Sequence, residues 1–199
     1  MASDVICRSG IGFVPEDRRI FPGLTAEENL LLGFMQCPSR SGAESSRQLN
    51  EIYQRFPRLG ERRLQMGTTL SGGEQQMLAI ARVLVGKLRL LLIDEPTEGL
   101  APKIVDEIFR IMDGLRRDGI PIVLVEQNVR RDIELSTRFY ALKRGQNCSK
   151  AMRPIPRTAK RCLSASLFEA ALPDAHGEDW RANYQIVLSC FLAELRLSH

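Results

Sequence analysis

The residues with the clearest chemical potential are Ser71, Gly72, Gly73 and Glu74, which follow Leu70 in the run LSGGE. A serine three residues before a glutamate is typical of a capping box, so Ser71 is expected to cap a helix whose third position is Glu74. The two glycines leave the backbone N–H groups of the first turn bare. Because the helix dipole favours negative charge at this end, the pattern predicts a helix start that can hold an anion such as a phosphate.

A second chemical feature is the carboxylate pair Asp94 and Glu95, which directly follows a run from Leu88 to Ile93 that is apolar except for Arg89. Such a run is typical of a strand buried on both faces of a parallel sheet. In open α/β sheets, ligands bind beyond the carboxyl ends of the strands, so both acids are expected at a ligand-binding edge. By itself the pair is equally consistent with an acid that merely caps the next helix.

Taken together, LSGGE (70–74) and LLLIDEP (90–96) resemble the signature and Walker B motifs of the ATP-binding-cassette (ABC) ATPases. Four more segments resemble the ATPase subunits of branched-chain amino-acid importers: VPEDRRIFPGLTAEENL (14–30), EQQMLAIAR (74–82), TEGLAP (97–102) and LVEQN (124–128). The resemblance covers roughly residues 8–146. It implies an α/β fold, the P-loop NTPase-like core of an ABC ATPase, with a helical subdomain and signature helix over about residues 26–86.

The resemblance implies a nucleotide-binding role for the helix start. Ser71, Gly72 and Gly73 would contact the γ-phosphate of an ATP held by a second ABC ATPase subunit, and Glu74 would complete this nucleotide-binding set. Closure of the two subunits would drive transmembrane permease subunits. The chain is therefore expected to be cytoplasmic, held at the inner face of the cell membrane by those permease subunits.

The resemblance also implies a catalytic set that uses ATP and Mg²⁺. Asp94 and Glu16 would hold Mg²⁺, Glu95 would act as general base on the attacking water, and Gln127 would help to position that water. Glu16 and Gln127 are each about equally consistent with ordinary polar loop residues.

The phosphate loop of the family, G-x-x-x-x-G-K-[ST], has no counterpart within these 199 residues. Its backbone N–H groups and lysine would cradle the phosphates. Gly86-Lys87 is the one Gly-Lys pair, and Leu88 stands where Ser or Thr is needed. The interpretation is an incomplete ABC ATPase domain over residues 1–146, N-terminally truncated with its phosphate-loop strand and helix missing. A divergent tail over residues 147–199 would follow, and the chain alone would be inactive.

Composition limits the alternatives. The net charge of +4, from 28 basic and 24 acidic residues, is too balanced to favour a nucleic-acid partner. Five scattered cysteines form no CxxC pattern and suit reduced thiols. No apolar run approaches the length of a membrane span, and no signal peptide is evident at the start.

The elements that must position these residues follow from periodicity and breakers. Short strands are expected over residues 11–14, 121–125 and 138–143, besides the run before Asp94. Helices are expected from a second capping box at Thr25 to Phe34, over 49–56, from Ser71 to near Gly86, and over 102–118. Residues 37–48 are expected to form a flexible loop, and residues 184–197 an amphipathic helix.

Competing functions stay open from the sequence. The chain could be a non-enzymatic truncated remnant, or the ATPase subunit of a urea or amide importer. An ABC ATPase of DNA repair or translation is a third possibility, which the absence of long coiled-coil heptads disfavours.

Overall fold

In the computed structural model, the residues that can be described are 2–36, 41–86, 88–126, 138–143, 146–147 and 185–190. The helices of this part are α1 (Ser3–Arg8), α2 (Ala26–Leu32), α3 (Gly42–Arg55), α4 (Pro57–Glu61), α5 (Gly72–Leu84) and α6 (Pro102–Arg117), with 3₁₀ turns η1 (Gly33–Gln36) and η2 (Gly67–Thr69). The strands are β1 (Ile11–Val14), β2 (Leu90–Asp94), β3 (Ile122–Glu126), β4 (Arg138–Lys143), β5 (Gln146–Asn147) and β6 (Gln185–Cys190).

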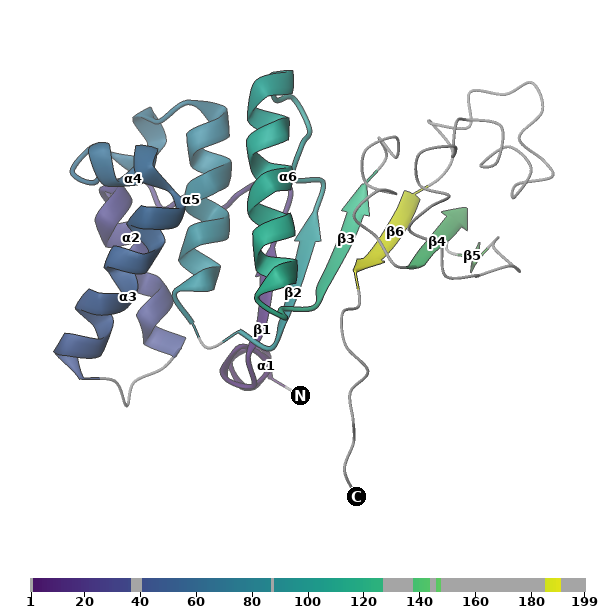
Figure 1. The fold of residues 1–199 in the computed structure, drawn as a ribbon, viewed down its shortest axis with the longest axis horizontal. Helices are drawn as coiled ribbons and strands as arrows, with labels where there is room; N and C mark the ends of the chain where they lie inside the picture. The colour runs from purple at the N-terminus through teal and green to yellow at the C-terminus, as the bar shows by residue number, and fades with distance from the viewer. Residues whose placement is uncertain are drawn as a thin grey trace.

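The strands form one six-stranded sheet in the order β1-β2-β3-β6-β4-β5. β1, β2 and β3 run parallel, whereas β6 pairs antiparallel with both β3 and β4. The parallel half is possible because α5 precedes β2 and α6 joins β2 to β3, which gives the chain room to cross over. Figure 1 shows α5 and α6 lying along one face of the parallel strands, with α2, α3 and α4 gathered beyond α5.

The parallel strands are fully buried on one face only. Leu91 and Ile93 of β2 are buried, and so are their register partners Ile122 and Leu124 of β3. On the opposite face, Leu90 and Leu92 of β2 are only partly buried, and Phe13 of β1 is 52% exposed. The expectation of burial on both faces is therefore wrong for the described residues, because α5 and α6 both pack against the same side of the sheet.

The close packing of α5 on the sheet depends on Gly12 of β1. A Cβ atom at this position would lie 2.2 Å from Cγ1 of Val83 in α5 and 2.5 Å from Cδ1 of Leu88. Since real Cβ atoms do not approach neighbours so closely, any larger residue here would push the helix away from the strand. This contact sets the distance between the helix that carries the LSGGE motif and the strand before Glu16.

The helices beyond α5 form a second layer. Leu30 of α2, Leu59 of α4 and Phe56 between α3 and α4 are buried in the common core. α3 starts earlier than expected, because the Ser41 side chain caps it by accepting a hydrogen bond from the Glu44 backbone N–H at 3.3 Å. Residues 42–48 are thus helical rather than a flexible loop, and residues 37–40 lie outside the described part.

The expected helix over residues 184–197 is also contradicted, because Gln185–Cys190 forms the strand β6. Leu188 is in register with Leu124 of β3 on one side and with Phe139 of β4 on the other. Two open strand edges therefore supply backbone partners on both sides, and this tertiary pairing outweighs a helical apolar period. The expected strands over 11–14 and 138–143 are confirmed.

Candidate functional site

Three acidic residues lie where the parallel strands end. Asp94 is the last residue of β2, Glu126 is the last residue of β3, and Glu16 follows β1 by two positions. Because the strands are parallel and in register, their carboxyl ends meet at one edge of the sheet. The structure therefore brings Glu16 and Asp94 to the same edge, as the sequence predicts.

The turn after β2 is held against the end of β3. Glu95 adopts a left-handed backbone, with φ of 45°, and its N–H donates to the carbonyl oxygen of Val125 at 2.9 Å. The backbone N–H and the hydroxyl of Thr97 both donate to Oε1 of Glu126, at 3.2 and 2.7 Å. Glu126 is only 2% exposed, so a buried carboxylate fixes the turn that carries Glu95. The left-handed backbone of Glu95 is therefore held in place by contacts with the end of β3.

Sequence reasoning missed Glu126 as a functional residue, although a signal was present. Glu126 follows the apolar run 122–125 just as Asp94 follows residues 90–93. Gln127, the next residue along the chain and a predicted catalytic residue, lies outside the described part.

The acids at this edge influence one another. A hydrogen bond with the Glu98 carboxyl, followed by the negative charge of Glu98, raises the pKa of Glu16 above its ordinary value. Smaller contributions come from slight burial and from the charges of Asp94 and Asp17. Glu16 and Asp94 are thus within electrostatic reach of each other, and Glu98 is a neighbour that the sequence did not single out.

The expected capping box at the start of α5 is confirmed. Ser71 Oγ accepts from the Glu74 N–H at 3.4 Å, and Glu74 Oε2 accepts from the Ser71 N–H at 2.9 Å and from Oγ at 2.7 Å. Arg62 pairs with the other oxygen of Glu74 at 3.1 Å. Burial alone would raise the pKa of Glu74, but the Ser71 hydrogen bonds and the charges of Arg62 and Arg58 outweigh burial and lower the pKa. Glu74 therefore acts by building the cap.

The two glycines place this helix start beside the acidic edge. A Cβ atom at Gly73 would lie 2.5 Å from Cγ2 of Ile104 in α6, so the first turn of α5 packs directly on α6. A Cβ atom at Gly72 would lie 3.2 Å from Nη1 of Arg18 and 3.7 Å from Cδ2 of Leu100. The start of α5 thus touches the loops after β1 and after β2, which also carry the acids.

The carboxylates at this edge are suited to supply part of the ligands of a Mg²⁺ site. No group of three or more His, Cys, Asp or Glu side chains in the described part of the chain is arranged to hold a metal ion. Protein sites for Mg²⁺ commonly supply one or two carboxylates while phosphates and water complete the shell. Asp94 and Glu16 are hard oxygen donors of this kind.

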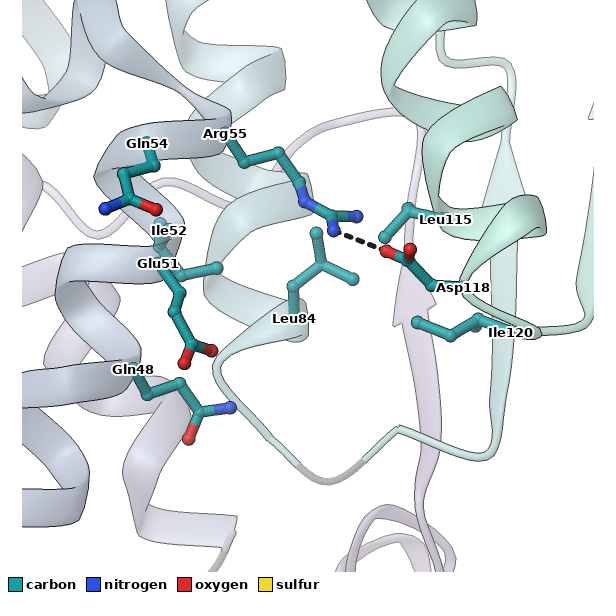
Figure 2. Close-up of a pocket in the computed structure, with 9 residues that line it drawn as sticks. All are labelled: Gln48, Glu51, Ile52, Gln54, Arg55, Leu84, Leu115, Asp118 and Ile120. Atoms are coloured by element: carbon teal, nitrogen blue, oxygen red, sulfur yellow. Dashed lines mark hydrogen bonds and ion pairs between the residues drawn. The ribbon is translucent and has the colours of Figure 1, made fainter.

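A separate cavity of about 490 Å³ lies between α3 and the C-terminal ends of α5 and α6. Its apolar floor includes Leu84, Leu115 and Ile120, and the ion pair between Arg55 and Asp118 spans it (Figure 2). Since Leu84 ends α5 whereas Ser71 caps its start, this cavity lies at the other end of the helix from the predicted site.

The ABC transporter family matches residues 2–98 of the chain. The chain belongs to the ABC transporter family. BraG, a high-affinity branched-chain amino acid transport ATP-binding protein of Pseudomonas aeruginosa, is 46% identical over 146 residues, which is 73% of this chain and 61% of the relative. LivF of Archaeoglobus fulgidus, a probable branched-chain amino acid transport ATP-binding protein, is 38% identical over 69% of this chain and 57% of its own length.

Solved structures agree with this ABC assignment. The ATP-binding subunit of an ABC transporter matches with a TM-score of 0.68 and 25% identity, over 86% of this chain and 71% of that one. A dimeric ATP-binding cassette bound to ADP and Pi matches with a TM-score of 0.56 and 28% identity, over 65% of this chain and 58% of that one. The ABC ATPase fold is therefore confirmed, with partial coverage: the chain spans 61% and 57% of the lengths of BraG and LivF.

No described helix of this ABC protein has the length and apolar content needed to cross a membrane.

Proposed function

We propose that this chain is an ATP-binding subunit of an ABC importer for branched-chain amino acids and couples ATP hydrolysis to solute uptake. The 46% identity to BraG supports the importer class. The observation that carries the proposal is the capped start of α5, where Ser71 is followed by two glycines at the edge that also holds Asp94 and Glu16.

The capped helix start is the chain's contribution to a shared nucleotide site. The Ser71 hydroxyl and the bare N–H groups of Gly72 and Gly73 meet the γ-phosphate of an ATP held by a second ATP-binding subunit. Helix-start N–H groups and the helix dipole both favour a phosphate there. The 199 residues contain no phosphate loop, so in this pairing the loop comes from the second subunit.

The acidic edge supplies the hydrolytic groups when a phosphate loop accompanies it. Asp94 and Glu16 would hold Mg²⁺, which when bound neutralises charge on the phosphates. Glu95 takes the proton of the attacking water as general base, and the Thr97–Glu126 bonds keep its turn in place. Gln127 would orient the water through its amide.

The partners on the other side are transmembrane permease subunits. Three apolar side chains between β1 and α3 are exposed: Phe21 in the loop after β1 (48% exposed), Leu31 in α2 (44%) and Met35 in η1 (73%). Exposed apolar side chains are commonly used to contact protein partners when they form one patch. Docking here would hold the subunit at the inner face of the cell membrane.

A complementation assay tests the shared site. The partner is a complete ABC ATP-binding subunit whose own signature serine is replaced by arginine, so that it releases no phosphate by itself. This chain alone is also expected to release none. If the chain supplies the missing signature, mixing the two restores ATP-dependent phosphate release, and Ser71→Arg in this chain removes it. A mixture that stays inactive with unaltered Ser71, although the two proteins associate, would show a non-enzymatic remnant.

A separate experiment tests the role of Glu95 as general base. A chimera carries the phosphate-loop segment of BraG ahead of this chain, so that the acidic edge has a nucleotide to act on. Glu95→Gln in the chimera should lower kcat by about 100-fold or more, the usual contribution of a general base. A kcat within a few-fold of the unaltered chimera would remove Glu95 from that role.

A further inference from the structure

The loop from Glu16 to Phe21, called the β1–α2 loop below, has an unusual backbone. Arg18 and Arg19 are consecutive non-glycine residues with positive φ, at 58° and 45°. Side chains disfavour this left-handed region, and two such residues in a row do not persist unless surrounding groups hold them. The loop therefore needs an anchor outside its own sequence.

Arg82, in the last turn of α5, is that anchor. Its Nη1 donates to the carbonyl oxygen of Arg19 at 2.8 Å, and its Nη2 donates to the carbonyl oxygen of Arg18 at 3.2 Å. The guanidinium also lies over the ring of Phe21, 5.2 Å from its centre. One planar group thus contacts three residues of the loop, a geometry that a single-point cation such as lysine cannot reproduce.

Two further residues, Asn29 and Arg18, add contacts between the loop and its neighbouring helices. Asn29 of α2 is fully buried, and its Oδ1 accepts from the Phe21 N–H at 3.0 Å and from Arg82 Nη1 at 3.5 Å. Arg18 Nε donates to Oε1 of Gln76 in α5 at 3.1 Å, while its Nη1 lies over Gly72. The loop therefore contacts α5 at two positions along the helix, near its capped start and in its last turn.

We infer that Arg82 is a positioning residue, which locks the β1–α2 loop onto α5 so that Glu16, Phe21 and the Ser71 cap move as one body. Glu16 reaches the acidic edge, and Phe21 is half-exposed and is one of the apolar side chains proposed to contact the permease. A displacement at Phe21 is then transmitted through the guanidinium to the helix that faces the phosphate. The consequence for hydrolysis rests on the proposed function, whereas the locking itself does not.

Amide hydrogen exchange on the unliganded chain tests the locking. Arg82→Met keeps an apolar stem of similar length and removes the guanidinium. The amides of residues 17–21 should then exchange about tenfold faster or more, while those of α6 and β2 keep their rates. Arg82→Lys should give an intermediate increase. Arg116→Met is the matched control, because Arg116 pairs with Asp113 within α6 and does not touch the loop.

Two exchange results would overturn the inference. Unchanged rates in residues 17–21 would show that Arg82 does not hold the loop. Equally faster exchange throughout α5, α6 and β2 would show that Arg82 only stabilises the whole fold.

The complementation assay gives the second readout. With the active mixed pair, Arg82→Met should lower kcat about tenfold and leave the KM for ATP within about twofold, because the second subunit's phosphate loop holds the nucleotide. An unchanged kcat despite faster loop exchange would refute the coupling. If the unaltered pair is itself inactive, the proposed function fails, and the exchange experiment still decides whether Arg82 positions the loop.

Discussion

Two helices of this protein begin with the same device and differ in what surrounds it. Thr25 and Glu28 form a capping box at the start of α2, and Ser71 and Glu74 form one at the start of α5. In both, the hydroxyl accepts from the third backbone N–H of the helix while the glutamate accepts from the N-cap N–H. The local hydrogen bonding is therefore equivalent.

The environments of the two boxes differ in burial and in the residues between cap and acid. Glu28 is exposed, whereas Glu74 is 4% exposed and paired with Arg62. The α2 box encloses residues 26–27, which are Ala and Glu, and the α5 box encloses two glycines. A capping box thus sets where a helix begins, while the bare amides of Gly72 and Gly73 make the α5 box a candidate phosphate site.

The largest expected effect is on phosphate release, which should depend on the α5 capping box and not on the α2 capping box. In the complementation assay, Ser71→Arg should lower phosphate release about 100-fold or more, because the arginine side chain fills the site and keeps the phosphate from the Gly72 and Gly73 N–H groups. Thr25→Arg at the matched position should leave release within about threefold, since only helix stability changes. Equal losses from both substitutions would mean that the α5 box acts only as a cap.

A smaller effect, on stability, distinguishes the two glycines of the α5 box. Gly73→Ala should lower the free energy of unfolding by about 1–3 kcal/mol, because the new Cβ overlaps Ile104 in the packed contact with α6. Gly72→Ala should change it by less than about 0.5 kcal/mol, because its neighbour is the movable end of Arg18. Urea denaturation of both variants measures the difference, and equal costs would contradict the tight α5–α6 contact.

Removing either cap hydroxyl should lower the free energy of unfolding by a similar or smaller amount than Gly73→Ala does. Thr25→Ala should cost about 1 kcal/mol, the usual value for an N-cap. Ser71→Ala should cost about 2 kcal/mol, because the buried Glu74 also loses a donor. Thermal or urea unfolding of the pair provides the test, and a larger loss from Thr25→Ala would show that burial of the acid is unimportant.

The smallest expected effect is the pH dependence of the two acids. The folded-state pKa values of Glu74 and Glu28 both lie below the ordinary 4.5, so each ionised carboxylate favours the folded state. This stabilisation is complete above pH 4.5 and is lost as the pH falls through the lowered pKa. Glu74→Gln and Glu28→Gln should therefore each flatten the acid limb of the unfolding free energy. An acid limb that either substitution leaves unchanged in acid urea titrations would contradict the lowered pKa of that carboxylate.

Local signals in the sequence determined much of this protein. Both capping boxes, the strand ending at Asp94 and the strand over residues 138–143 follow from short-range rules of spacing and side-chain type. The motifs around Ser71 and Asp94 likewise indicated the ABC ATPase fold, which the comparisons confirm. Such features depend on a few consecutive residues and therefore leave a readable pattern.

The tertiary structure alone decided the features that depend on distant segments. Residues 185–190 form a strand because β3 and β4 offer two edges for pairing, which no local helical period can reveal. The exposure of Phe13 follows from α5 and α6 packing on a single face of the sheet. The contacts Glu126–Thr97 and Arg82–Arg19 join residues 29 and 63 positions apart, so only the fold brings those donors and acceptors together.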